Sequence, residues 1–179
     1  MGKNIVVISG SPRKKGNTER LMQSFIEGAE SAGKNVKVFR TPEMKIGGCV
    51  GCEHCFTEKG VCVQKDDMQQ ILEAIKQSDT LVLASPVYYF DVTAQLKLAI
   101  DRTFALISVG NPIKKAALLM TCGDNTAEVA DGAVVSYRAI CSYSKWEDAG
   151  VIIATNLHKP GEIEGRDELK AAEKLGREI

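Results

Sequence analysis

Apolar and polar positions follow one another along the chain in a way that predicts strands and helices in succession. Short runs of apolar or alternating residues predict strands at 4–9, 36–39, 81–84, 116–120 and 151–154. The continuous runs are typical of strands buried on both faces. Between them, apolar residues recur at helical spacing in segments that begin near 17, 66, 93, 127 and 166, which predicts amphipathic helices. We expect Asn17 or Thr18 to cap the first helix, and Asp66 or Asp67 the second.

This succession predicts an α/β architecture. Strands that alternate with helices form crossover units, and these give a parallel sheet with helices on both faces. Five such strands fit a three-layer sandwich with strand order 2-1-3-4-5, in which ligands bind beyond the carboxyl ends of the strands. The loops expected at that edge are 9–18, 85–91 and 121–126. We expect one domain over 1–179, with a cysteine-rich insertion at about 45–65.

The first loop has the composition of an anion site. It runs from a buried strand through serines, glycines and basic residues into a helix N-terminus, where N–H groups and the helix dipole favour negative charge. It lacks the glycine pattern of dinucleotide folds and the ending of a Walker loop. A solvated turn is the alternative, and phosphate binding is the better interpretation. The candidate phosphate ligands are Ser9, Ser11, Arg13, Lys14, Asn17 and Thr18.

The second and third loops offer groups that suit a planar ligand. Three aromatic residues follow a proline in the second loop, where they could contact a flat ring or a neighbouring subunit, or could cap the core. In the third loop a glycine permits close backbone approach beside polar side chains. The candidate residues are Pro86, Val87, Tyr88, Tyr89, Phe90, Cys122, Gly123 and Asp124.

Charge and composition narrow the function classes. The chain has 23 basic and 23 acidic residues among 179, so no basic excess points to nucleic acid or a membrane surface. No apolar run approaches the length of a membrane span, and the N-terminus enters a strand without the pattern of a signal peptide. We therefore expect a cytoplasmic protein, in which cysteines are thiols or metal ligands rather than disulfides.

Four of the six cysteines lie close together in the sequence. Cys49, Cys52, Cys55 and Cys62 have the spacing C-x2-C-x2-C-x6-C, which can wrap one metal ion or one cluster. By ligand chemistry alone, a zinc ion would fit these cysteines equally well. A metal-free loop of reduced thiols is a further interpretation. Cys122 and Cys141 are isolated.

Three groups of motifs resemble a known family. They are Gly10–Arg13 with Gly16–Thr18, the four cysteines with Asp66–Met68, and Ser85–Tyr88. Together they are similar to the NAD(P)H-dependent FMN reductase group of flavodoxin-like proteins, and within it to the four-cysteine branch that includes the iron–sulfur flavoproteins. The resemblance runs to about residue 110, and the remainder matches in layout only.

The resemblance implies a flavodoxin-like fold with FMN at the predicted edge. The first loop would bind the FMN phosphate, the second would line the isoalloxazine ring, and the third would approach its other edge. It also implies a candidate [4Fe–4S] cluster on the four cysteines, beside the zinc and thiol readings. Hydride chemistry belongs to the flavin, so we expect no catalytic acid–base residue.

The function expected first is an FMN-dependent oxidoreductase that uses NAD(P)H as co-substrate. It would pass electrons to a small acceptor such as a quinone, a free flavin, or an azo or nitro compound. The alternatives are an iron–sulfur flavoprotein that carries electrons, and a zinc- or thiol-based redox sensor. The flavin would be exposed in a fold of this size, so we expect a homodimer or homotetramer with the flavin near the interface, walled by Tyr88, Tyr89 or Trp146.

Overall fold

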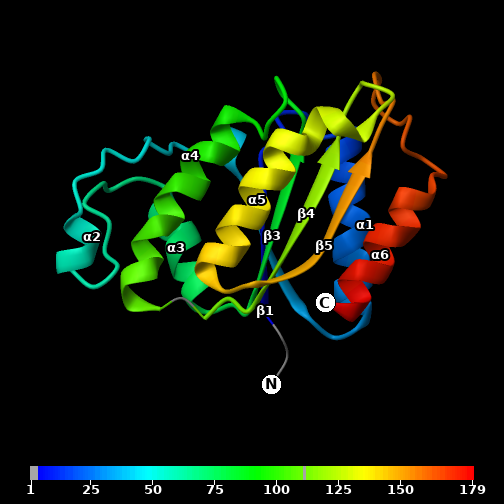
Figure 1. Cartoon of the computed structure of the whole chain (residues 1–179). Coiled ribbons are helices and arrows are strands. Elements are labelled where there is room, and N and C mark those ends of the chain that lie inside the picture. The colour runs from blue at the N-terminus through cyan, green and yellow to red at the C-terminus, as the bar shows by residue number, and fades with distance from the viewer. Residues whose placement is uncertain (1–3, 111) are drawn as a thin grey trace.

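A single parallel sheet forms the centre of the computed structural model, which describes residues 4–110 and 112–179. Its strand order is β2-β1-β3-β4-β5, and the strands run in one direction (Figure 1). The predicted flavodoxin-like α/β sandwich with strand order 2-1-3-4-5 is therefore confirmed. The strands are β1 (Asn4–Ser9), β2 (Asn35–Arg40), β3 (Thr80–Pro86), β4 (Lys115–Thr121) and β5 (Glu147–Ala154).

Helices cover both faces of the sheet (Figure 1). The helices α1 (Asn17–Ser31) and α6 (Asp167–Glu178) lie on one face, and α3 (Met68–Lys76), α4 (Ala94–Thr103) and α5 (Asp131–Ser144) lie on the other. Alternate residues of β1 serve the two cores: Ile5 and Val7 pack with α1 and α6, whereas Val6 and Ile8 pack with α3, α4 and α5. The apolar run of β1 is thus continuous because both faces of the strand are buried.

The cysteine segment leaves this sandwich sideways. After β2 a short 3-10 helix at Thr41–Glu43 begins a stretch that includes the short helix α2 (His54–Thr57) and returns to α3. Figure 1 shows α2 beyond α4, at the outer end of that helical layer. Among the described residues, no helix is both long and apolar enough to cross a membrane.

Two elements start about four residues away from their predicted positions. The helix expected from 127 begins as a 3-10 helix at Ala127–Ala130, and α5 proper starts at Asp131. The last strand starts at Glu147 rather than 151, because its polar residues pair with β4 across a register shift at Ala116/Ala117. Backbone pairing in a sheet does not require apolar side chains, so the hydrophobic pattern misses such strand ends.

The predicted cap of α1 is wrong. Gly16 occupies the N-cap, and no side chain caps the helix, because the side chains of Asn17 and Thr18 bond to other segments. At α3 the N-cap is Asp67, as one of the two predicted candidates, but its side chain makes no cap hydrogen bond. The carboxylate of the preceding Asp66 accepts from the Met68 N–H at 3.1 Å.

Candidate functional site

Hydrogen bonds join the three predicted loops at the carboxyl edge of the sheet. The Thr93 hydroxyl, just after the second loop, donates to the carbonyl of Gly10 in the first loop at 2.9 Å. The Val87 N–H donates to the carbonyl of Thr121 at 2.8 Å, and the hydroxyls of Thr18 and Thr121 lie 2.6 Å apart. Each loop is therefore tied to the other two.

The first loop places donors around the start of α1. Ser9 and Ser11 are buried, and the N–H groups of Ser11 and Arg13 donate to the hydroxyls of Ser9 and Ser11, each at 3.3 Å. Arg13 itself is exposed. Since no side chain caps the helix, its first N–H groups remain available to an anion. The loop is therefore compatible with the predicted phosphate site, whose binding role stays a prediction.

Besides Thr18, whose hydroxyl pairs with that of Thr121, two of the predicted phosphate ligands are engaged elsewhere. Lys14 forms an exposed ion pair with Glu43 at 3.0 Å. The amide of Asn17 bonds through both of its ends to the backbone of 159–161, at 2.9 and 3.0 Å. These side chains brace the loop from its two flanks, and Arg13 is better placed than either to meet a phosphate.

The second loop ends in a tight turn with two exposed aromatic residues. Tyr88 and Asp91 exchange backbone hydrogen bonds of 2.9 and 3.2 Å across it. The two residues between them, Tyr89 and Phe90, both have positive φ, of 48° and 70°, a conformation that costs about 1–2 kcal/mol for each L-residue other than glycine. Their exposures are 96% and 61%. Strain and apolar exposure together are typical of a ligand or interface surface.

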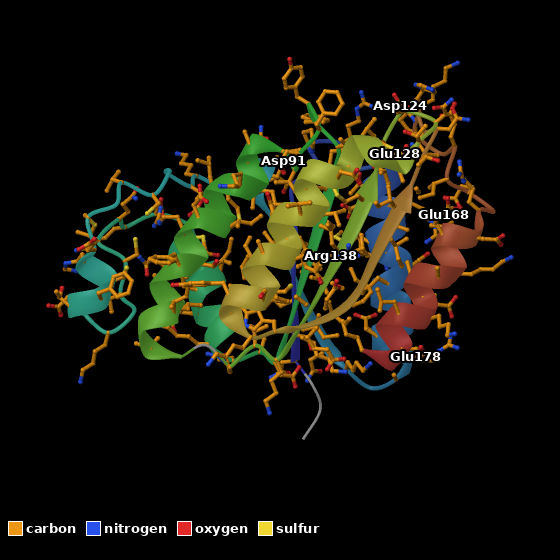
Figure 2. All side chains as sticks on the ribbon, in the orientation of Figure 1. Asp91, Asp124, Glu128, Arg138, Glu168 and Glu178 are labelled. Carbon is orange, nitrogen blue, oxygen red and sulfur yellow. The ribbon has the colours of Figure 1, made fainter. Side chains whose placement is uncertain are left out.

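The third loop carries a buried thiol and an exposed carboxylate. Burial, with a further contribution from the Asp124 charge, raises the pKa of the Cys122 thiol, so this thiol is protonated near neutral pH. Gly123 lies against the imidazole of His158. A Cβ at position 123 would be only 3.2 Å from His158 Nδ1. Figure 2 shows Asp124 at the same end of the molecule as Asp91 of the second loop. The structure therefore brings together the predicted flavin-binding residues, whose binding role stays a prediction.

The four clustered cysteines line one cavity away from those loops. The cavity has a volume of about 340 Å³, and its walls include Cys49, Cys52, Cys55, Cys62 and residues of α4. No disulfide joins them. Figure 1 shows the cysteine segment beside α4, whereas the three loops lie at the upper edge of the sheet. Within one chain, the thiols are thus separate from the predicted flavin surface.

The donor set of this cavity fits an iron–sulfur cluster. Burial is the main cause that raises the pKa of the Cys55 thiol, and the three neighbouring cysteines add to the rise. Among the described residues, no three His, Cys, Asp or Glu side chains are close enough to hold a single metal ion. A cluster binds each thiolate through a different iron, whereas a single zinc ion binds its sulfurs at about 2.3 Å.

Trp146 lies at the other end of the sheet. It immediately precedes β5 and lines a groove of about 620 Å³ between α4 and α5, together with Phe104 and Tyr143. The groove reaches Cys49 at one end. A flavin held by the loops of this chain would therefore not meet Trp146 of the same chain, and the expected oligomer stays a prediction.

An ion pair beside the thiols is not predicted by the hydrophobic pattern. Arg102 on α4 pairs with Asp66 at 2.9 Å. The available signal was that Arg102 follows Leu96 and Ala99 at helical spacing, on the stripe of α4 that is buried.

Comparison with known proteins gives a consistent relationship. The family model for NADPH-dependent FMN reductase matches residues 3–146. An iron–sulfur flavoprotein of Archaeoglobus fulgidus is 35% identical over 97% of this chain and 77% of the relative. With several other iron–sulfur flavoproteins the match spans about half of the relative's length. A Bacillus subtilis protein named as an NAD(P)H-dependent FMN-containing oxidoreductase is 26% identical over 96% of this chain and 95% of its own.

The fold agrees with this relationship. The structure of an NAD(P)H:quinone oxidoreductase from Methanothermobacter marburgensis superposes with a TM-score of 0.74 at 21% identity, covering 99% of this chain and 96% of the other. That likeness concerns the fold. On the strength of the family model and the Archaeoglobus relative, this chain belongs to the NADPH-dependent FMN reductase family.

Proposed function

We propose that this protein is an iron–sulfur flavoprotein, which binds FMN at the sheet edge and a [4Fe–4S] cluster on Cys49, Cys52, Cys55 and Cys62. The observation that carries the proposal is the cavity lined by all four thiols, in a chain that matches an iron–sulfur flavoprotein over 97% of its length. The sequence motifs favour direct reduction of a small acceptor first. The curated relatives favour its alternative, an electron carrier.

Each part of the chain has a defined task in this proposal. Bound FMN would exchange hydride with NAD(P)H and single electrons with the cluster, chemistry that belongs to the cofactors. The first loop holds the phosphate with Arg13 and the N-terminus of α1. The Tyr88–Asp91 turn and the third loop orient the ring and exclude water from it. The cysteine segment supplies four thiolates and keeps them in one cavity.

The composition of the purified protein tests the proposal. Protein prepared without oxygen should contain FMN, iron and inorganic sulfide, and should show broad absorbance beside the flavin bands that bleaches on reduction. Flavin without iron, even after anaerobic reconstitution with iron and sulfide, would contradict the proposal. One zinc per chain without flavin would favour the redox-sensor alternative instead.

A cluster-free NAD(P)H oxidoreductase is the second candidate. Its support is the similarity to the FMN-containing oxidoreductase of B. subtilis over nearly both full lengths. The two candidates separate when all four cysteines of the segment are replaced by alanine. Unchanged NAD(P)H-dependent reduction of quinone, flavin, azo or nitro compounds would favour the second candidate.

Removal of two groups from the first loop should weaken FMN binding. The double variant Ser11→Ala with Arg13→Ala loses the hydroxyl that orders the loop and an exposed positive charge. A charge-assisted contact contributes about 1.5–3 kcal/mol, so the dissociation constant of FMN should rise about tenfold or more, as measured by fluorescence quenching of the flavin.

Lys15→Ala is the matched control for this prediction. Lys15 is an exposed basic residue of the same loop and is not among the candidate phosphate ligands. Its loss should leave the FMN dissociation constant within about twofold of the original, as expected for a solvated surface charge. Equal weakening in the control and the double variant would mean that only general charge attracts the cofactor.

A further inference from the structure

A buried arginine holds the cysteine segment. Arg102 lies on α4, and its side chain is 0% exposed. Its Nη1 donates to Asp66 Oδ2 at 2.9 Å and to the carbonyl of Gly47 at 2.8 Å. Its Nη2 donates to Asp66 Oδ1 at 3.0 Å and to the carbonyl of Gln64 at 3.4 Å. One guanidinium thus binds a carboxylate through both oxygens and two backbone carbonyls.

These contacts close the two ends of the segment that carries the thiols. Gly47 stands just before Cys49, and Gln64 just after Cys62. The Gly47 N–H donates to Asp66 Oδ2 at 2.8 Å, and the Gln64 side chain donates to the carbonyl of Gly48 at 2.8 Å. The start and end of the loop are therefore joined through one ion pair, on a rigid helix.

The same arginine also belongs to the wall of the thiol cavity. Arg102 lines that cavity together with the four cysteines. Its Nε–H is buried and has no hydrogen-bond partner among the described residues. A buried donor without an acceptor is unfavourable, so this side chain retains hydrogen-bonding capacity next to the sulfurs.

We propose that Arg102 is the positioning residue of the iron–sulfur site: it anchors both ends of the cysteine segment and donates hydrogen bonds to sulfur, which raises the reduction potential of the cluster. This inference rests on the proposed function. Hydrogen bonds to the sulfurs and local charge both set the potential of such clusters. Reduction adds negative charge, and a donor or cation beside the sulfurs favours the reduced form.

Asp66 allows the direction of the shift in reduction potential to be tested. It offsets the charge of Arg102, so the two side chains should act on the potential in opposite directions. Arg102→Gln removes the charge and keeps an amide donor at about the position of the arginine Nε, so the potential should fall. Asp66→Asn removes the compensating charge, so the potential should rise. A purely structural role would loosen the segment in both variants and would not give shifts of opposite sign.

The experiment is a redox titration of the full-length protein reconstituted with iron and sulfide. We expect the equilibrium constant for cluster reduction to change about tenfold in each variant, about 59 mV for a one-electron couple. Arg102→Lys keeps the charge without the planar fork and should lie between the wild type and Arg102→Gln. The control is Arg138→Gln, whose parent residue is exposed on α5 and pairs with Asp148, and it should leave the potential unchanged.

A second readout does not require the cluster. In the iron-free protein, backbone amides of 47–64 should exchange hydrogen faster in Arg102→Gln and Arg102→Lys than in the wild type or Arg138→Gln. Equal potentials in all loaded variants, or shifts of the same sign in Arg102→Gln and Asp66→Asn, would overturn the redox role. Unchanged exchange would overturn the anchoring role. A wild-type protein that binds no iron would overturn the proposed function and with it the redox role, while the exchange rates would still decide the anchor.

Discussion

Replacing Gly28 by alanine should lower the free energy of unfolding by about 3 kcal/mol, since overpacking of a well-filled contact costs roughly this much. A Cβ at Gly28 would lie 1.9 Å from the carbonyl oxygen of Glu173 in α6. The contact is reciprocal, because a Cβ at Gly176 would lie 2.0 Å from the carbonyl oxygen of Phe25 in α1. These neighbours are helix backbone atoms and cannot rotate away, so the helices must move apart.

Urea denaturation followed by circular dichroism measures this effect. Gln23→Ala is the control, because Gln23 lies on the exposed face of α1 and its loss should change stability by less than about 0.5 kcal/mol. The N-terminus of α1 forms part of the proposed phosphate site, so the Gly28 variant should also bind FMN more weakly. An unchanged denaturation midpoint would show that α1 and α6 tolerate a larger separation.

Replacing Cys55 by alanine should remove stably bound iron from the protein. Cys55 packs against the core that includes α3 and α4, as does Cys62, so movement of the loop would not readily bring another thiol into its place. Three thiolates would remain, and a cubane cluster needs a fourth ligand. Iron and sulfide analysis of protein reconstituted without oxygen, with the visible spectrum, measures the loss. The FMN content should be retained, because the three flavin loops lie elsewhere.

The matched control is Cys141→Ala. Cys141 is buried on α5 and does not line the cavity of the four thiols. Its replacement should leave the iron content unchanged, at a modest cost in stability. The same iron content in the Cys55 and Cys141 variants would contradict the assignment of the four cysteines as cluster ligands.

The pattern of apolar residues predicted the sheet well where burial determines it. The strands β1, β3 and β4 are buried almost throughout, so their residues read as continuous apolar runs. At the edge of the sheet the pattern is weaker, and β5 begins with the exposed Glu147 and Asp148. Backbone hydrogen bonds position those residues, so the hydrophobicity of their side chains does not indicate that they belong to a strand.

The candidate site shows a similar division. The order of parallel strands requires the three loops to share one edge, so their convergence could be predicted. The partners of their side chains could not, because they come from distant parts of the chain. Asn17 bonds to 159–161, and Thr18 bonds to Thr121, which is why neither caps α1.

By itself, the sequence determined the strand order, the edge at which a ligand would bind, and four thiols close enough along the chain to share a site. These follow from local periodicity and short spacing. Only the tertiary structure decided that the thiols lie beside α4 rather than beside the flavin loops, and that Arg102 closes their segment. A charged residue on a helix is ordinarily expected to be exposed to solvent. Arg102 is buried because Asp66 and the carbonyls of Gly47 and Gln64 pair with its guanidinium where they pack against α4.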